Sequence, residues 1–450
     1  MTESSDKLPF HLKGNYAPVD EEVSAVDLPV IGAIPEELNG RYFRNGPNPK
    51  SGTSGHWFAG DGMIHGVRLR DGNVDWYRNR WVRTRALLEP EARMRDKSGN
   101  VDRTIGVSNT HIVGHGGKIM ALVESSFPCE LSPDLETVGV FDFDGKLNTA
   151  MTAHPKTCPV TGEQHFFGYG FLPPYLTYHR VSADGRLVQS EVIDVPGPTM
   201  IHDFAITEHH VIFMDLPVVF DLDLAMKGTM PYRWDDDYGA RVGIMPRSAG
   251  DGPSAGGADV QWFEVEPCYV FHPLNAFVAG DGTVNVDTAR YERLWSRSSD
   301  DFRDHATLHR WSFDLAAGAV KETALDDRPF EFPRVAEHLT GLPNRYGYGA
   351  GGLDGNAIIK YDLEKGTSEL RDYGREALPG EPVFVPAADA ESEDHGWLLS
   401  YVYNRADQSS DFVILDARDV GGEPVAVVPL PQRVPFGFHG SWFDDRDFGG

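Results

Sequence analysis

The stretch MIHGVRLRDGNVDWYRNRWV, from Met63 to Val82, indicates the fold class of this chain. Apolar and polar residues alternate on both sides of a central Asp-Gly pair, which is typical of an antiparallel hairpin with a tight turn. Similar runs recur along the chain, among them KIMALVES, LTYHRVSADGRLVQSEVI, FVAGDGTVNVDTARY and AIIKYDLEKGTSELRDY. Runs with helical spacing are scarce. The sequence therefore predicts an all-β protein.

The number of these short strands favours a closed β-propeller. A single β-sandwich holds fewer hairpins than the sequence predicts, whereas a propeller blade needs about four short strands. The chain has 450 residues, enough for several blades. No repeat of fixed period is present, so the blades have diverged and periodicity does not reveal their number. The Gly- and Ser-rich stretch from Pro246 to Trp262 is the most linker-like segment, but it is too short to mark a domain boundary.

The composition excludes several classes of partner. Lys and Arg number 41 and Asp and Glu number 68, which gives a net charge of −27. Such an acidic surface disfavours nucleic acid and electrostatic docking on anionic lipid. The N-terminal stretch lacks the apolar core of a signal peptide, and no run approaches the length of a membrane span. We therefore expect a cytoplasmic protein. Its odd number of cysteines argues against a disulfide framework; they are Cys129, Cys158 and Cys268.

Two pairs of histidines have the spacing of a helical metal site. His111 and His115 lie in HIVGH, and His305 and His309 lie in HATLH. A spacing of four residues brings two imidazoles together only on a helix. Both pairs lie in strand-like or Gly-rich segments, so we interpret them as structural or exposed residues.

Four other histidines share a different context. Each lies near the end of a predicted strand and is followed at once by Pro, Asp or Gly: His154 in TAHPKT, His202 in MIHDFAIT, His272 in VFHPLNA and His439 in GFHGSW. The inner strands of propeller blades face a common axis. One histidine from each of four blades could meet there, although the four are far apart in sequence. The pattern permits this site without requiring it.

A set of longer motifs resembles the carotenoid cleavage oxygenase family, which includes apocarotenoid oxygenases, lignostilbene dioxygenases and the retinal pigment epithelium isomerase. The motifs include RNGPNP, HWFAGDGMIHG, ALVESSFPCEL, TAHPKTCPVTGE, MIHDFAIT, FHPLNA, FEFPRV, GEPVFVP and FHGSW. They follow the family order and extend from Tyr42 to Trp442, nearly the whole chain. This agreement is more specific than any single motif.

The resemblance implies a fold and a metal site. The fold is a seven-bladed propeller with a cap of loops and short helices over one face. Residues 1–450 form one propeller domain, on which roughly the first 40 residues pack as an arm. One Fe²⁺ per chain is held by His154, His202, His272 and His439. Three glutamates accept the far ring N–H groups of the ligands; by motif they are Glu124, Glu331 and Glu381. Phe58 lines the substrate passage.

The implied reaction is cleavage of a conjugated C=C bond by O2 into two carbonyl products. No side chain is expected to act as acid or base, and no obligate protein partner is expected. The substrate is a lipophilic or aromatic alkene. Val123 occupies the position where relatives that cleave 4-hydroxystilbenes carry Lys, which favours an apocarotenoid. A stilbenoid or phenylpropanoid is the alternative. An isomerase or hydrolase on the same scaffold and a non-catalytic propeller are further alternatives.

Two segments have alternative interpretations. Cys158 lies where the family often has Asp; a thiol near iron is an oxidation liability, but a small buried apolar residue is the favoured interpretation. The segment FGYGFLPPYLTY, from Phe167 to Tyr178, could provide an apolar patch for peripheral membrane contact. Buried core is the interpretation that we favour for it.

Overall fold

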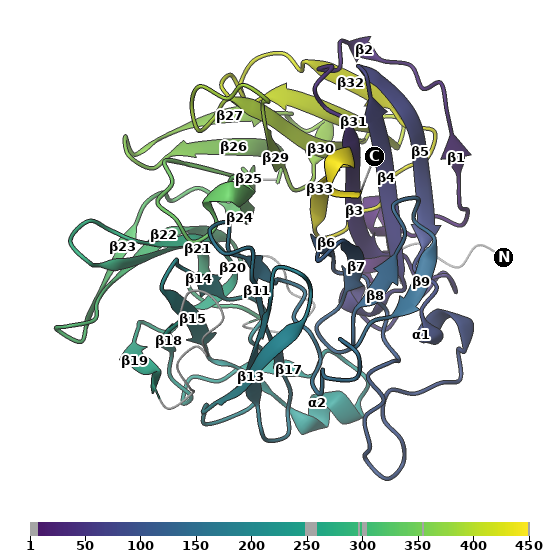
Figure 1. Ribbon diagram of the computed structural model, residues 1–450. Coiled ribbons are helices and arrows are strands. Elements are labelled where there is room, and N and C mark those ends of the chain that lie inside the picture. The colour runs from purple at the N-terminus through teal and green to yellow at the C-terminus, as the bar shows by residue number, and fades with distance from the viewer. Residues whose placement is uncertain (1–7, 248–258, 296–297, 299–303, 353–354, 449–450) are drawn as a thin grey trace.

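The computed structural model describes residues 8–247, 259–295, 298, 304–352 and 355–448. Most of the linker-like stretch from Pro246 to Trp262 lies outside these ranges. In the described part of the chain, seven antiparallel sheets follow one another around an axis (Figure 1). Each holds at least four strands, so these sheets are the blades of a seven-bladed propeller, as predicted.

The blades are numbered here in chain order. Blade 1 holds β3 (Gly40–Pro47), β4 (Gly62–Arg70), β5 (Asn73–Trp81) and β33 (Gly440–Asp444). Blade 2 holds β6 (His111–His115), β7 (Lys118–Leu122), β8 (Cys129–Leu131) and β9 (Thr137–Val140). Blade 3 holds β10 (Lys156–Thr157), β11 (Gln164–Tyr169), β12 (Leu176–Val181) and β13 (Leu187–Ile193). Blade 4 holds β14 (Ala205–Ile206), β15 (His210–Asp215), β18 (Arg241–Pro246) and β19 (Gln261–Glu264).

The remaining blades have the same antiparallel order. Blade 5 holds β20 (Tyr269–Val278), β21 (Val284–Tyr291), β22 (Ala306–Asp314) and β23 (Ala319–Ala324). Blade 6 holds β24 (Phe330–Arg334), β25 (Tyr346–Gly351), β26 (Ala357–Asp362) and β27 (Thr367–Asp372). Blade 7 holds β28 (Ala377–Pro379), β29 (Val383–Pro386), β30 (Gly396–Asn404), β31 (Ser409–Asp416) and β32 (Ala426–Pro429).

The two ends of the chain close the ring. The last strand, β33, pairs with β3 in blade 1, with Arg44 opposite Gly440 (Figure 1). Near the other end, β1 (Ser24–Ala25) pairs with β5, and β2 (Ile31–Gly32) extends blade 7 by pairing with β32. The side chain of Asn15 also donates a hydrogen bond to the Val434 carbonyl over 3.2 Å. Because sequence-distant strands complete both blades, neither blade can form from a local segment alone.

The hairpin expected from Met63 to Val82 is present as β4 and β5. Arg70 pairs with Asn73 across a two-residue turn. Both turn residues have positive φ, +48° at Asp71 and +72° at Gly72. Two left-handed residues in succession are what a type I′ turn requires, and this turn matches the twist of the strands that it joins. The Asp-Gly signal therefore predicts this connection correctly.

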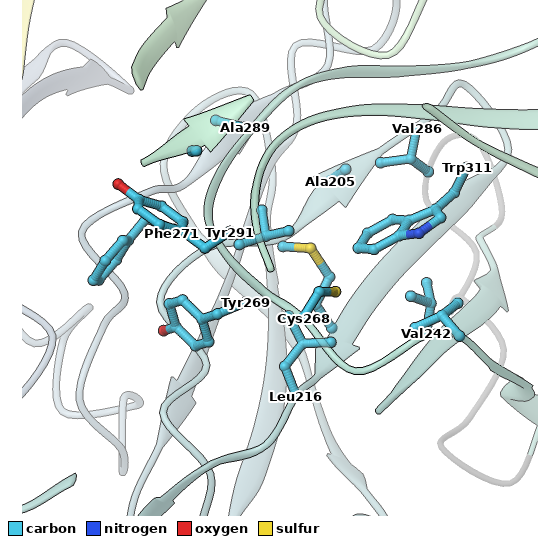
Figure 2. Packing of buried hydrophobic residues seen from close by; sticks show 14 of the residues in the cluster. Ala205, Leu216, Val242, Cys268, Tyr269, Phe271, Val286, Ala289, Tyr291 and Trp311 are labelled. Carbon is cyan, nitrogen blue, oxygen red and sulfur yellow. The ribbon is translucent and has the colours of Figure 1, made fainter. Parts of the chain in front are cut away.

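The apolar core lies between neighbouring blades. Its largest cluster joins residues of blades 4, 5 and 6. Figure 2 shows Trp311 of β22 among Val242, Val286 and Cys268. The Trp311 side chain is 1% exposed. All three cysteines of the chain are buried and unpaired, which agrees with the expected absence of a disulfide framework.

Short elements lie before, between and after the blade strands. They are η2 (Phe10–Leu12), η3 (Gly14–Tyr16), η4 (Trp57–Ala59), α1 (Arg85–Leu88), α2 (Leu222–Met226), η6 (Glu337–Leu339), η7 (Asp445–Phe448) and the ribbon of β16 (Val218–Phe220) with β17 (Tyr232–Trp234). Tyr16, Phe58 and Tyr232 of these elements help to line a large cavity over the axis. Among the described residues, none of the helices has an apolar stretch long enough to cross a bilayer.

Candidate metal centre

Four histidines from four blades meet on the axis. His154 precedes β10 of blade 3, His202 precedes β14 of blade 4, His272 lies in β20 of blade 5, and His439 directly precedes β33 of blade 1. One ring nitrogen of each lies within 4.8 Å of the others. Each histidine thus lies on or beside an edge strand of its blade, and the closed ring directs these edges toward one point.

Backbone irregularities accompany two of the site residues. The pairing of β20 with β21 shifts register on both sides of Pro273, directly after His272. Proline cannot donate to the ladder, and a bulge bends the strand that carries it. In β24 the register also shifts between Glu331 and Arg334, and Phe332 has a φ of +51°. These bulges break the regular alternation of side chains at His272 and Glu331, which contact each other.

Each of the three predicted glutamates accepts a hydrogen bond from Nδ1 of a different histidine. Glu124 Oε1 contacts His202, Glu331 Oε2 lies 2.7 Å from His272, and Glu381 Oε1 lies 2.9 Å from His439. A carboxylate only accepts, so Nδ1 of each partner carries the proton. In the neutral ring, Nε2 then presents a lone pair. This is the tautomer that binds a metal ion through Nε2.

These lone pairs face one another at short range. His202 Nε2 lies 3.1 Å from His272 Nε2 and 3.0 Å from His154 Nε2. The Nδ1 protons of His202 and His272 are both held by carboxylates, so neither neutral ring has a proton to place between the two Nε2 atoms. Two lone pairs at this distance repel unless a cation lies between them. Two nitrogens that each bind one ion at about 2.1 Å are no more than about 4.2 Å apart, so the donor set fits a metal ion.

Burial favours the neutral, metal-binding form in two of the four histidines. Burial lowers the pKa of His154 and of His439 well below the usual value, and the neighbouring imidazoles lower both further. Burial also lowers the pKa of His202, but the charge and hydrogen bond of Glu124 and the charges of Asp203 and Glu331 together raise it by more, so the net shift is upward. Neutral imidazoles are the ligand form, and three nearby carboxylates offset the charge of a divalent ion.

A large cavity leads to one side of the cluster. It has a volume of about 1210 Å³, and its wall includes His202, His272 and His439. Most of the remaining wall is aromatic or aliphatic. Phe58 belongs to it, as expected, and its ring lies 5.5 Å from that of Phe438, which also lines the cavity. Such a cavity suits a long apolar ligand with one end close to the histidines.

A smaller, more polar cavity of about 530 Å³ also reaches the cluster. Its wall includes His154, Lys156 and Asp203. His272 and His439 line both cavities, so the histidine cluster lies where the two spaces meet. His154 lines only the smaller cavity, and His202 lines only the larger one.

Known proteins are similar to this chain in sequence and in structure. Residues 16–444 match the family described as retinal pigment epithelial membrane protein. A carotenoid cleavage oxygenase of Mycobacterium tuberculosis is 40% identical over 498 residues, and the match covers 96% of this chain and 97% of that protein. This chain belongs to the carotenoid cleavage oxygenase family. It is accordingly an oxidoreductase, and the four histidines form the metal site typical of the family.

Other members of the carotenoid cleavage oxygenase family are also similar. The carotenoid 9,10(9′,10′)-cleavage dioxygenase 1 of Arabidopsis thaliana is 38% identical, with 96% of this chain and 89% of that protein covered. Among solved structures, the Pseudomonas brassicacearum lignostilbene dioxygenase has a TM-score of 0.86 at 29% identity, covering 97% of this chain and 99% of that one. A cobalt-substituted Synechocystis apocarotenoid oxygenase has a TM-score of 0.84 at 28% identity, covering 96% and 98%.

His154 differs from the other three ligands of this carotenoid cleavage oxygenase. None of the predicted glutamates contacts it, and the carboxylate nearest to its Nδ1 is Asp203 Oδ2 at 3.7 Å. Asp203 is 2% exposed and pairs with Lys156 Nζ at 2.8 Å. The sequence interpretation missed this ion pair. The sequence does place two opposite charges beside ligand histidines: Lys156 is two residues after His154, and Asp203 directly follows His202.

The glutamates are themselves held in place. The Tyr169 hydroxyl donates to Glu124 Oε2. The backbone N–H of Phe332 donates to Glu331 Oε2 over 2.6 Å, and that of Gly440 donates to Glu381 Oε2 over 2.8 Å. The carboxylates therefore have limited freedom to turn away from the histidines. The sequence interpretation did not single out Tyr169, because its contact with Glu124 joins two blades.

The histidine pairs with helical spacing do not join the cluster found among the described residues. His111 comes closest, with its ring 5.1 Å from that of His439, but its Nδ1 lies 2.8 Å from the Ala153 carbonyl oxygen, to which it donates. His309 Nε2 lies 3.0 Å from the Thr307 hydroxyl. These contacts agree with a structural role. His305 lines the large cavity without belonging to the cluster.

Two further interpretations concern buried residues. Cys158 is 2% exposed and packs in an apolar cluster with Phe167, as expected for a small buried residue. The segment from Phe167 to Tyr178 is buried at both ends. Leu172 at its turn is 58% exposed and lies at the wall of the large cavity. Core packing thus describes the two ends of this segment, and its exposed residues are limited to the turn from Leu172 to Pro174.

Replacement of Glu331 by glutamine is expected to lower metal affinity or turnover by about 10–100-fold, the usual cost of losing a carboxylate behind a ligand histidine. The amide keeps the shape but loses the charge that fixes the His272 tautomer. Metal retention during titration with a chelator measures the effect. Glu364→Gln is the matched control, because Glu364 is exposed and pairs with Arg345, which contacts none of the residues of the centre. Equal losses in both variants would contradict the assigned role.

Proposed function

We propose that this carotenoid cleavage oxygenase is an iron(II) dioxygenase that cleaves one C=C bond of an apocarotenoid. The observation that carries this proposal is the apolar cavity of about 1210 Å³ whose wall includes three of the four converging histidines. A conjugated polyene is long, apolar and electron-rich, so it matches both the wall and the oxidative chemistry of the family.

The side chains proposed to hold the iron are His154, His202, His272 and His439. Imidazole is a suitable ligand for Fe(II), and four neutral ligands leave room at the ion for further groups. Bound Fe(II) would supply the one-electron chemistry that lets O2 react with an alkene. Glu124, Glu331 and Glu381 would orient three of the ligands through their Nδ1 protons.

The overall reaction needs no further reactant. Both atoms of O2 enter the alkene, the C=C bond breaks, and each carbon becomes a carbonyl carbon. The four electrons that reduce O2 come from the alkene itself. The protein therefore contributes positioning and exclusion of water. Aromatic side chains such as Phe58, Phe332 and Phe438 line the same cavity as the histidines. No side chain has to transfer a proton.

Val123 supports an apocarotenoid over a 4-hydroxystilbene. It lies in the wall of the cavity next to Glu124, and its side chain presents no charge to a phenolate. The names of several similar relatives also refer to carotenoid cleavage. The structural similarity to a lignostilbene dioxygenase keeps a stilbenoid as the second candidate.

The test is incubation of iron-loaded protein under air with an apocarotenal and, separately, with 4-hydroxystilbene. We expect about one iron per chain by elemental analysis and aldehyde products from the apocarotenal by mass spectrometry. Cleavage of the stilbene alone would overturn the substrate assignment. If the protein binds iron and cleaves neither alkene, the proposed reaction itself is wrong.

A further inference from the structure

Two arginines line the large cavity at a place where it meets solvent. Both Arg95 and Arg103 belong to its wall. Arg95 is exposed and Arg103 is half-buried, which places this pair near the opening and not beside the histidines. The wall also includes Arg44, which is buried and donates to the Pro435 carbonyl, and Arg405, which follows β30 of blade 7. Arg95 and Arg103 are the two that lie close together in the chain.

Local structure holds the Arg95 side chain and the main chain at Arg103. Arg95 Nη1 donates to the Gly99 carbonyl over 2.9 Å, and its guanidinium lies 4.6 Å from the centre of the Phe171 ring. The main chain at Arg103 accepts a hydrogen bond over 2.9 Å from the N–H of Phe127. Phe127 follows the segment that carries Glu124. The loop with the two arginines is therefore docked against a segment of the metal centre.

Neither arginine has an acidic partner. Among the described residues, no Asp or Glu forms an ion pair with Arg95 or Arg103, although the chain has 68 acidic and 41 basic residues. The neighbouring Asp102 pairs instead with Arg85, at 2.9 Å. Burial lowers the pKa of Arg103, and the positive charge of Arg95 lowers it further. Arg95 and Arg103 therefore repel each other and lack a negatively charged partner in the protein. A ligand with an anionic group would supply that partner.

We propose that Arg95 and Arg103 bind a carboxylate at one end of the substrate, so that the preferred substrates are conjugated polyene acids. This inference rests on the proposed function, because it places the polyene in the same cavity. Guanidinium groups bind carboxylates through paired, charge-assisted hydrogen bonds, which an aldehyde cannot match. The glutamates behind the histidines repel an anion. The acid end therefore remains near the opening, and the polyene extends inward along the apolar wall.

The position of Arg103 favours a ligand inside the cavity over an anionic membrane surface. A lipid headgroup would contact exposed side chains such as Arg93 and Arg95, which lie on one loop, whereas Arg103 is half-buried in the cavity wall. Arg93 does not line the cavity. It therefore offers a matched control for the charge of this loop.

The experiment compares Arg103→Met with Arg93→Met in the iron-loaded protein. The substrates are an apocarotenal and the apocarotenoic acid with the same polyene. For Arg103→Met we expect KM for the acid to rise about tenfold, the effect of losing one charge-assisted contact, and KM for the aldehyde to stay within about twofold. Arg93→Met should change neither. Arg103→Lys should recover part of the loss.

A binding measurement separates this inference from the proposed reaction. Quenching of tryptophan fluorescence reports the affinity for the acid and for the aldehyde without any need for cleavage. If neither compound is cleaved but the acid binds more tightly than the aldehyde, and Arg103→Met removes the difference, the reaction is wrong and the carboxylate site stands. Equal weakening of both ligands would show that Arg103 only shapes the cavity. The carboxylate site would also be overturned if Arg103→Met still bound the acid more tightly than the aldehyde. The same holds if the variant lost only its binding to vesicles of anionic lipid.

Discussion

Replacement of His272 by alanine is expected to release the metal and to reduce alkene cleavage by more than about a hundredfold. Loss of an outer carboxylate alone costs about 10–100-fold, and loss of a ligand removes a direct bond to the ion as well. His272 Nε2 lies 3.1 Å from His202 Nε2, within the set of converging nitrogens. Its Nδ1 donates to Glu331, so the replacement also leaves that carboxylate without its donor. Elemental analysis of the purified variant and the rate of aldehyde formation measure the two effects.

His165→Gln is the matched control for this experiment. His165 is also buried, and its Nδ1 contacts the Tyr178 hydroxyl at 2.7 Å, away from the metal centre. The control should keep its metal even if it is less stable. Full metal content in His272→Ala, or equal metal loss in the two variants, would contradict the assignment of His272 as a ligand.

Replacement of Trp311 by alanine is expected to destabilise the fold by about 3–5 kcal/mol, the usual cost of truncating a buried aromatic residue. Trp311 is 1% exposed and lies in the cluster between blades 4, 5 and 6 (Figure 2). Its Nε1 also donates to Glu322 Oε2 over 3.0 Å. The truncation would leave a cavity among rigid strands and remove this hydrogen bond. The urea concentration at the midpoint of unfolding and its slope give the loss.

Trp397→Ala provides the comparison. Trp397 of β30 is partly buried, so less apolar contact is lost and a smaller shift is expected. Similar midpoints for the two variants would show that burial at Trp311 is not what stabilises these blades.

Local sequence patterns were sufficient for the strands and their turns. Alternation and an Asp-Gly pair predicted the hairpin from Met63 to Val82, since both features act over neighbouring residues. The four ligand histidines were also accessible, because each is followed by Pro, Asp or Gly. The expected strand end is wrong for His272, since Pro273 forms a bulge within β20. Their assignment as one set, however, came from the family resemblance. Spacing alone only permitted a shared site.

The partners within the centre depended on the closed ring. Which glutamate holds which histidine, such as Glu381 with His439, is decided by how blades 1 and 7 meet. The Lys156–Asp203 pair joins blades 3 and 4 in the same way. No local signal specifies such pairings, because the two residues become neighbours only when the blades close.

The sequence by itself determined the all-β class, the hairpin turns, the family and its candidate ligands. Alternating hydrophobicity and turn residues act locally, and long motifs remain recognisable without a structure. Only the tertiary structure decided the meeting of four imidazoles within 4.8 Å, the pairing of β33 with β3 and the arginines at the cavity opening. These features depend on distances across the ring, and such distances are set by the packing of whole blades against one another.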